Sequence, residues 1–237
     1  MEIIKGIEIL DTCILINKKI LVLADLHIGY EEALNKQGAF APRIQFKETE
    51  IKLNEIFGKI KEKLDVIVIN GDLKHEFGTI SDQEWEETMK ILDLLQKYCK
   101  QIVLVKGNHD SILGPIAKKR GLNIVESYII GDVCIIHGDK ILDNSSVLSA
   151  KILIIGHEHP AISIREEPKV EKYKCFLLGK YKKQQLIVMP SFLPIIEGTD
   201  IGKEKLLSPY LHQNLKNFEV FVVGDKTYRF GKLKNIL

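Results

Sequence analysis

Long apolar runs are missing from this chain of 237 residues, and none approaches the roughly 18 residues that a membrane-spanning helix needs. The first five residues lack the charged-then-apolar pattern of a secretion signal. The four cysteines are scattered and form no Cys-x-x-Cys pair, which argues against a disulfide framework and against a zinc ribbon. We therefore expect a protein of the cytoplasm with no membrane association.

A large excess of charge of one sign is also missing, since the net charge is +2 with 28% charged and 45% apolar residues. Such a weak positive charge neither requires nor excludes nucleic acid as a partner. Proline and glycine are too sparse to mark a linker, and there is no internal repeat. Because the length lies within the range of one domain, residues 1–237 are expected to form a single domain.

Five short apolar runs rich in valine and isoleucine are present, at residues 20–24, 66–69, 102–105, 133–136 and 152–155. None of them alternates between apolar and polar residues, which is typical of strands that are buried on both faces. Between the first three runs the spacing is helical. Residues 46–64 form one such segment, with Ile51 and Ile56 on its apolar side. Ser81 and Glu84 form a capping box, which predicts a helix from there to Tyr98.

The order of these segments predicts a parallel sheet joined by helical crossovers in the first half of the chain. After about residue 120 the pattern becomes rich in strands. Hairpins are predicted at Gly131-Asp132 and at Gly224-Asp225, and residues 161–189 are predicted to alternate short strands with lysine-rich turns. Two packed sheets with helices outside them are therefore expected.

Each of the five apolar runs leads into residues that can bind a metal. The segments are Asp25-Leu26-His27, Asn70-Gly71-Asp72, Gly107-Asn108-His109-Asp110, His137-Gly138-Asp139 and Gly156-His157-Glu158-His159. Because sites in α/β sheets form where the carboxyl ends of strands meet, these side chains are expected to converge at one edge. A single histidine after a strand is usually only hydrogen bonded, and a single Gly-Asp is usually a turn. However, six of the seven histidines lie in or just after these segments.

The expected ligands are imidazole, carboxylate and one amide oxygen, without thiolate: Asp25, His27, Asp72, Asn108, His137, His157 and His159. Such a set suits Mn²⁺, our first expectation, or Fe²⁺, Zn²⁺ or Ni²⁺, with open coordination positions. Seven ligands are too many for one catalytic ion. Two divalent metal ions sharing a carboxylate, about 3.5–4 Å apart, fit better.

The order D-x-H, G-D, G-N-H-D, H and G-H-x-H resembles the motif set of the calcineurin-like metallophosphoesterases. The chain is most similar to the archaeal SbcD-related and DNA-ligase-associated members, through residues 24–31, 71–78, 156–160 and Pro190-Ser191-Phe192. The resemblance, together with the two-sheet pattern, implies an α/β fold that forms a four-layer α/β/β/α sandwich with mixed sheets. Leu193 stands where related sequences often have Asn, which predicts a changed pocket rim.

The resemblance also implies the two sets of metal ligands. Metal 1 would be held by Asp25, His27, Asp72 and His159, and metal 2 by Asp72, Asn108, His137 and His157. A hydroxide between the metals would attack phosphorus.

Three further residues receive roles from the resemblance. His109 would protonate the leaving group or stabilise the transition state without binding a metal, and Asp110 would orient His109. His75 would lie near the substrate phosphate; the alternative is a histidine that supports a metal ligand or caps a helix.

The implied activity is phosphoester hydrolysis, with a phosphodiester in nucleic acid or nucleotides as the leading substrate. The alternatives are a small-molecule phosphatase or cyclic-nucleotide phosphodiesterase, and a non-catalytic interaction module. The related DNA-repair nucleases are longer and carry regions for DNA binding and ATPase docking, for which this chain has no room. Six lysines between residues 169 and 183 are interpreted as a solvated edge, or alternatively as a patch that attracts phosphate. The oligomeric state is left open.

Overall fold

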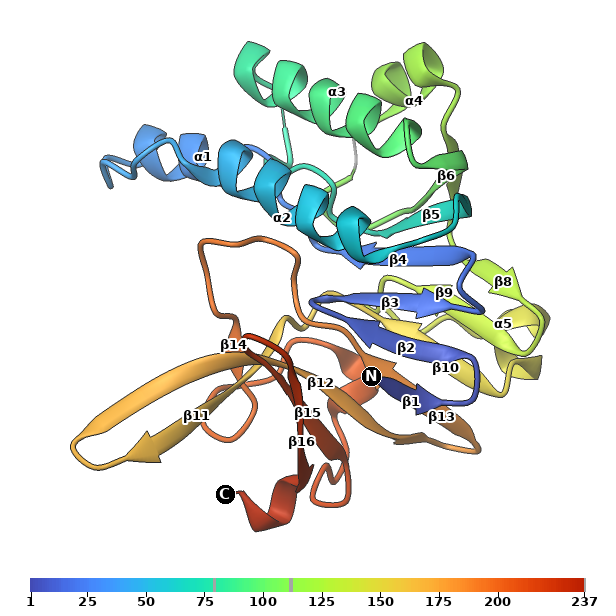
Figure 1. Ribbon diagram of the computed structural model, residues 1–237, viewed down its shortest axis with the longest axis vertical. Coiled ribbons are helices and arrows are strands. Elements are labelled where there is room, and N and C mark those ends of the chain that lie inside the picture. Colours follow the sequence, from blue (N-terminus) through green and yellow to red (C-terminus); the bar gives the residue numbers. More distant parts are fainter. Residues whose placement is uncertain (79, 111–112, 237) are drawn as a thin grey trace.

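The protein is built from two stacked β-sheets, with helices packed mainly on one side of the stack (Figure 1). The computed structural model describes residues 1–78, 80–110 and 113–236. The first sheet contains, in spatial order, β1 (Glu2–Ile4), β2 (Ile7–Leu10), β3 (Cys13–Ile16), β4 (Ile20–Ala24), β5 (Leu64–Asn70), β6 (Cys99–Val105) and β7 (Asn123–Val125). Strands β4 to β7 are parallel and β1 to β4 are antiparallel, so this sheet is mixed.

The second sheet is also mixed. It contains β8 (Tyr128–Ile130), β9 (Val133–Ile136), β10 (Ile152–Ile155), β11 (Pro160–Glu166), β12 (Lys169–Tyr181), β13 (Gln184–Val188), β14 (Thr199–Asp200), β15 (Glu219–Val223) and β16 (Thr227–Lys232). Its parallel core is β9-β10-β13, and both predicted hairpins are present as β8–β9 and β15–β16.

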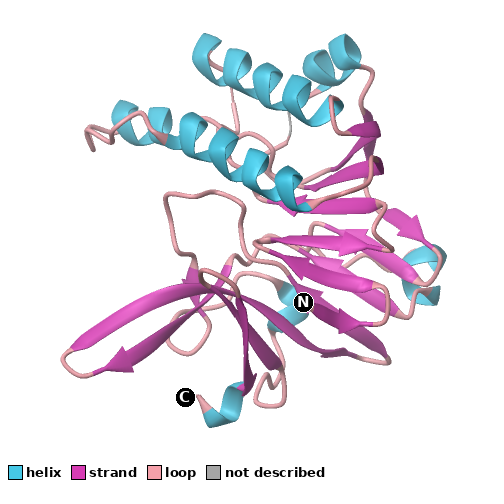
Figure 2. Ribbon diagram, viewed as in Figure 1, coloured by secondary structure: helices cyan, strands magenta, loops and turns pink. Residues whose placement is uncertain are grey.

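The helices form the outer layers (Figure 2). The first sheet is covered by α1 (Tyr30–Lys36), α2 (Gln45–Lys59), α3 (Asp82–Gln96) and α4 (Gly114–Arg120). The second sheet is covered by the short α5 (Ser145–Ser149) and the 3-10 turns η1 (Pro209–Leu211) and η2 (Leu233–Asn235). The predicted α/β/β/α arrangement of four layers with mixed sheets is confirmed. No helix among the described residues is both long enough and apolar enough to span a bilayer.

Strand β4 shows how the layers are held together. Leu21 and Leu23 pack against the helices, whereas Val22 and Ala24 pack between the two sheets. All four are fully buried. Because successive side chains of a strand point to opposite faces, a strand with both faces covered must be apolar at every position. This confirms the prediction of doubly buried strands.

The structure differs from the sequence prediction at several boundaries. Helix α2 ends at Lys59 and not at residue 64, and Ile51 lies on its exposed face with 42% of its surface accessible. Helix α3 ends at Gln96, so Tyr98 lies beyond it and stacks on Phe57. The three strands β1 to β3 were not predicted.

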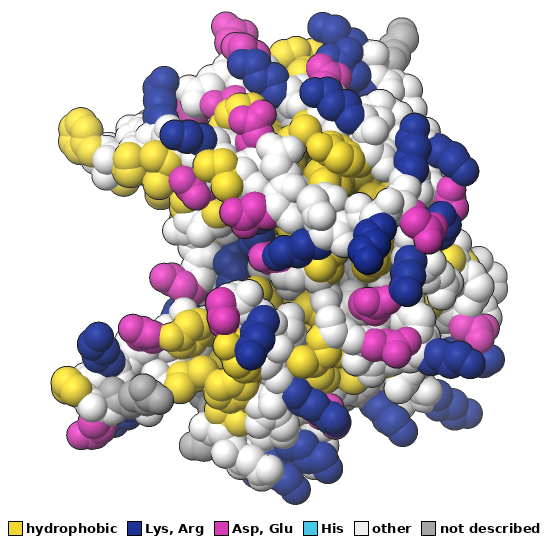
Figure 3. Space-filling view, in the orientation of Figure 1, with side chains coloured by type: hydrophobic (Ala, Val, Ile, Leu, Met, Phe, Trp, Pro, Cys, Tyr) yellow, Lys and Arg dark blue, Asp and Glu magenta, His cyan; other side chains and the backbone are white. Residues whose placement is uncertain are grey.

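The lysine-rich segment also differs, because β12 is one strand of 13 residues. Lys172 lies within it and forms an ion pair with Glu204 at 2.9 Å. Lys174 points inward and donates to the carbonyl of Ser191 at 2.7 Å. The lysines therefore do not form one exposed patch. The β11–β12 hairpin instead forms an arm, and a space-filling view shows a hollow between this arm and the end of the molecule that carries α1 (Figure 3).

Candidate metal centre

The motif segments follow strands whose carboxyl ends lie at the same edge. In the first sheet, Ala24 at the end of β4 pairs with Asn70 at the end of β5, which in turn pairs with Val105 at the end of β6. In the second sheet, Ile136 at the end of β9 pairs with Ile155 at the end of β10. The segments that follow these residues therefore start close together, as the sequence predicted.

Asp25, His27 and His159 form the first cluster that could hold a metal ion. The Nε2 atoms of His27 and His159 lie 3.3 Å apart, and Nε2 of His159 lies 3.4 Å from Oδ1 of Asp25. Asp25 is fully buried and its carboxylate also accepts the amide N–H of His157. Two imidazole nitrogens and a carboxylate oxygen thus face one point, which is an arrangement suited to a divalent cation.

Asp72, His137 and His157 form the second cluster. Nε2 of His137 lies 3.4 Å from Oδ2 of Asp72 and 3.0 Å from Oδ1 of Asn108. The rings of His137 and His157 meet edge to face with their centroids 5.0 Å apart. Asn108 thus adds its amide oxygen to this cluster.

Asp72 connects the two clusters. Its Oδ2 atom lies 3.4 Å from Nε2 of His137 in the second cluster and 3.7 Å from Nε2 of His27 in the first. All seven residues predicted as metal ligands therefore come together around one shared carboxylate. The set has no thiolate and fits two divalent ions.

The electrostatics of the centre also fit cations. Burial raises the pKa of Asp72, but His137 and His27 lower it more, so the carboxyl stays ionised. Burial lowers the pKa of His137, whereas the hydrogen bond to Asp72 and the charges of Asp25 and Asp72 raise it to about 9. In the metal-free protein a proton on His137 therefore takes the place of part of the positive charge that a metal would bring.

Several of the predicted ligands have a strained backbone. Positive φ angles are found at Asp25 (56°), His27 (46°), Asp72 (49°), His157 (66°) and His159 (51°). This left-handed region is unfavourable for residues with a side chain, at about 1 kcal/mol or more each. Such strain is concentrated where the surrounding structure holds a functional geometry in place. Here it turns the side chains that follow each strand toward a common centre.

Gly71 and Gly107 allow the backbone to approach the ligands closely. A Cβ atom at Gly71 would overlap the ring of His137, and one at Gly107 would overlap the carboxylate of Asp72. Any larger residue would have to displace a ligand.

His109 and His75 lie beside the two clusters. The Nδ1 atom of His109 is hydrogen bonded to the carbonyl oxygen of His75, so Nδ1 carries the proton. Its Nε2 atom lies 4.0 Å from Oδ2 of Asp72 and faces the centre. The two rings stack with centroids 5.2 Å apart. His109 is thus oriented by a backbone carbonyl.

A third group, formed by His27, His75 and His109, could also hold a cation. It would use Nδ1 of His27, which lies 3.4 Å from Nδ1 of His75, whereas Nε2 of His27 faces the carboxylates. Carboxylates attract a cation more strongly than imidazoles do, so the first two clusters are favoured.

The role predicted for Asp110 needs correction. Its carboxylate accepts the amide N–H groups of Gly107 (2.9 Å), Asp72 (2.8 Å) and Leu73 (3.1 Å). The contacts described for Asp110 therefore tie two loops together, and its carboxylate is not what orients the His109 ring. Burial, followed by the charge of Asp72, raises the pKa of Asp110 to about 6.

Sequence reasoning also missed three buried residues that support the centre. Gln45 donates to the carbonyl of His27 at 2.7 Å. Glu84 accepts the amide N–H of His75 at 3.0 Å, and Lys74 donates to the carbonyl of His109 at 2.9 Å. In the sequence, Glu84 is noted only as part of a capping box that predicts the start of a helix. Only the Ser81 half of this box is present, with Ser81 accepting the N–H of Glu84.

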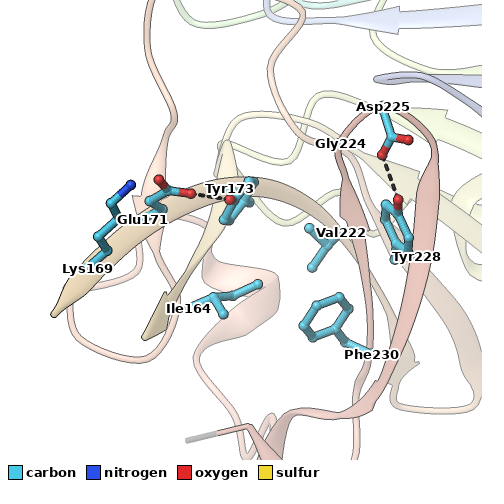
Figure 4. Close-up of a pocket in the computed structure, with 9 residues that line it drawn as sticks. All are labelled: Ile164, Lys169, Glu171, Tyr173, Val222, Gly224, Asp225, Tyr228 and Phe230. Carbon is cyan, nitrogen blue, oxygen red and sulfur yellow. Dashed lines mark hydrogen bonds between the residues drawn. The ribbon is translucent and has the colours of Figure 1, made fainter. Parts of the chain in front are cut away.

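A hollow of about 260 Å³ opens over the centre. Its lining combines the imidazoles with an apolar rim that includes Leu193, Ile196 and Leu207. Among the described residues that line it there is no lysine or arginine. A larger hollow of about 500 Å³, between the β11–β12 arm and the β15–β16 hairpin, has no histidine in its lining (Figure 4). Of these two hollows, the one over the clusters is lined by the histidines of the candidate metal centre.

Comparisons with known proteins identify relatives of this arrangement. The sequence model of the calcineurin-like phosphoesterases matches residues 18–173. No curated protein sequence gives a significant match. Nuclease MPE from Pseudomonas putida has a similar structure, with a TM-score of 0.67, 17% sequence identity and coverage of 94% of this chain and 93% of that chain.

Two other solved structures are more distant. Vps29 from Entamoeba histolytica, complexed with zinc, gives a TM-score of 0.38 at 16% identity, over 90% of this chain and 98% of that chain. A predicted phosphoesterase from Streptococcus pneumoniae gives 0.34 at 16% identity, over 90% and 97%.

Proposed function

Because the chain belongs to the calcineurin-like phosphoesterase family and is thus a metal-dependent phosphoester hydrolase, we propose that it hydrolyses phosphodiesters of nucleic acid or nucleotides with two divalent metal ions. The observation that carries this proposal is the position of Asp72, whose carboxylate lies between the two ligand clusters. A carboxylate shared in this way is what a two-metal hydrolase needs.

The chain's own residues would divide the work as follows. Asp25, His27 and His159 would hold one ion, Asn108, His137 and His157 the other, and Asp72 would contribute to both. When bound, two such ions neutralise the phosphoryl oxygens and activate water. We propose Mn²⁺ as the native ion, with Fe²⁺, Zn²⁺ and Ni²⁺ as alternatives that the same nitrogen and oxygen ligands accept.

His109 would supply the proton for the leaving group. With its Nδ1–H committed to the carbonyl of His75, only Nε2 is free to face the substrate. For this step the His109 ring would start as an imidazolium with a proton on each nitrogen. As water attacks phosphorus, the bond to the leaving oxygen breaks, that oxygen takes the proton from Nε2, and a neutral ring with its proton on Nδ1 remains. A positioned acid of this kind accelerates such a step by about 10²–10⁴-fold. His75 lines the same hollow and would contact the phosphate from the side.

The lining of the hollow favours a diester over a monoester. A monoester carries two negative charges, which proteins commonly bind with arginine or lysine. No such side chain is present among the described lining residues, and the rim is apolar. A diester has one negative charge and an organic group on each side, and these groups can pack against Leu193, Ile196 and Leu207. The fold shared with a nuclease is in keeping with a nucleic acid substrate.

The first test compares bis-p-nitrophenyl phosphate with p-nitrophenyl phosphate, using metal-stripped protein with added Mn²⁺, Ni²⁺ or Zn²⁺. Metal-dependent cleavage of the diester is expected, and Asp72→Ala should abolish it. DNA, RNA and cyclic nucleotides would then be tested in turn. Cleavage of the monoester alone would overturn the choice of a diester. Inactivity of protein that binds two ions would favour an interaction module.

A further inference from the structure

Lys74 is a fully buried lysine between the shared ligand Asp72 and His75. Its ammonium group donates to the carbonyl oxygen of His109 at 2.9 Å and to that of Glu76. Lysine is almost never fully buried unless its charge is compensated. The carbonyl groups of His109 and Glu76 therefore supply the polar contacts that allow this lysine to be buried.

Helix α3 holds the same loop, residues 74–76, through Glu84. Glu84 is fully buried, and its Oε1 atom accepts the amide N–H groups of His75 (3.0 Å) and Glu76 (3.1 Å). Burial raises the pKa of Glu84, while the charge of Lys74 acts in the opposite direction. The short loop that carries His75 is thus held at two N–H groups by the buried carboxyl group of Glu84 and at the carbonyl group of Glu76 by Lys74.

Lys74 also connects this loop to His109. The ring of His109 donates to the carbonyl of His75, and the carbonyl of His109 accepts from Lys74. The backbone and the ring of His109 are therefore both tied to the loop at residues 74–76. An apolar side chain of the same length would fill the space but leave two carbonyl groups without a donor. In that case the His109 ring could rotate or shift.

We propose that Lys74 is a positioning residue, which holds the His109 imidazole where its Nε2 atom can deliver a proton to the leaving oxygen. This inference rests on the proposed function, because it assigns Lys74 a part in the same reaction. Lys74 itself would not touch the substrate. Its described hydrogen bonds end on backbone carbonyl groups, and Lys74 is not among the described residues that line the hollow.

The test uses two diesters that differ in their leaving group. A p-nitrophenolate departs without needing a proton, whereas the 3′- or 5′-alkoxide of a dinucleotide needs one. Lys74→Met should lower kcat on the dinucleotide by about 10²-fold, in the range of a lost general acid. It should change kcat on bis-p-nitrophenyl phosphate by less than about threefold, since that leaving group needs little acid catalysis. KM and the binding of two Mn²⁺ ions should be unchanged.

His109→Ala is the reference for this pattern, and Lys74→Arg, which keeps a donor, should restore part of the lost rate on the dinucleotide. Lys151→Met, at an exposed lysine paired with Asp132 in the second sheet, is the control for the substitution itself. If Lys74→Met does not fold, Glu84→Gln takes its place. It keeps the size of the side chain but weakens the acceptor for the two amides of the loop, and it should shift the ratio of the two rates in the same direction.

Equal losses on both diesters, or no loss on either, would show that Lys74 is only structural. That result differs from failure of the proposed function. In the latter case the wild-type protein itself would not cleave either diester with any of the added metals.

Discussion

Oδ2 of Asp72 lies 3.4 Å from Nε2 of His137. The same oxygen lies 3.7 Å from Nε2 of His27, on the other side of the centre. One carboxylate therefore lies between two ligand clusters, and each cluster combines residues that follow strands of both sheets. Since Asp72 follows β5 and His137 follows β9, the two sheets must be packed in register for the centre to exist.

The first prediction concerns this shared carboxylate. Asp72→Ala should lose at least one metal equivalent, because each cluster then lacks a ligand. Metal content after dialysis, measured by mass spectrometry, checks this directly. Asp225→Ala is a suitable control, because Asp225 is exposed and bonds only Tyr228 among the side-chain partners described. A variant at position 72 that still holds two ions would refute the bridging role.

The second prediction concerns pH. His137 has a pKa of about 9 in the folded metal-free protein, against 6.5 ordinarily. Its protonated form therefore stabilises the fold fully below pH 6.5, and this contribution is lost as the pH rises to 9. The loss is on the order of 3 kcal/mol. The pKa of His27 is lowered to about 3, so it does not titrate in this window.

Thermal unfolding in the presence of a chelator should therefore show a falling Tm between pH 6.5 and 9, and His137→Asn should flatten that slope. Affinity for Mn²⁺ should rise over the same window, since binding must displace the proton. A metal affinity that does not change with pH would show that His137 is already neutral.

The third prediction concerns Gly107. A methyl group there would overlap the Asp72 carboxylate, so Gly107→Ala should weaken metal binding and reduce turnover by about 10-fold or more. Gly58→Ala is the matched control, because Gly58 lies in α2 with open space around it. That change should raise stability by about 0.5–1 kcal/mol. Calorimetry and Mn²⁺ titration of both variants distinguish the two outcomes.

The strand ends and the convergence of the seven candidate ligands could be predicted from sequence because both signals are local. A doubly buried strand must be apolar throughout, so the first polar residue marks its end. Roles that depend on side-chain direction could not be predicted in this way. Asp110 follows His109 directly, yet its carboxylate turns to Gly107 and Asp72. Adjacent residues in a turn point in different directions, and sequence adjacency does not reveal which.

Long-range packing explains why the positions of several lysines could not be predicted from sequence. From sequence, Lys172 and Lys174 are interpreted, with the other four lysines, as part of a solvated edge because lysine usually lies in water. In the structure Lys172 pairs with Glu204, and Lys174 donates to the carbonyl of Ser191. Lys74 gave no signal at all. Its burial depends on the carbonyl of His109, which lies 35 residues away and accepts a hydrogen bond from its ammonium group.

The last prediction concerns His109. Its ring is tied at Nδ1 to the carbonyl of His75 and lies outside the two favoured ligand clusters, so His109→Ala should keep both metals. Loss of a general acid should reduce kcat on a dinucleotide by about 10²–10⁴-fold. The smaller effect expected on bis-p-nitrophenyl phosphate separates proton donation from stabilisation of the phosphoryl charge, which would slow both substrates alike. An unchanged kcat on the dinucleotide would exclude His109 from catalysis, whereas loss of a metal would make the third imidazole group a true ligand set.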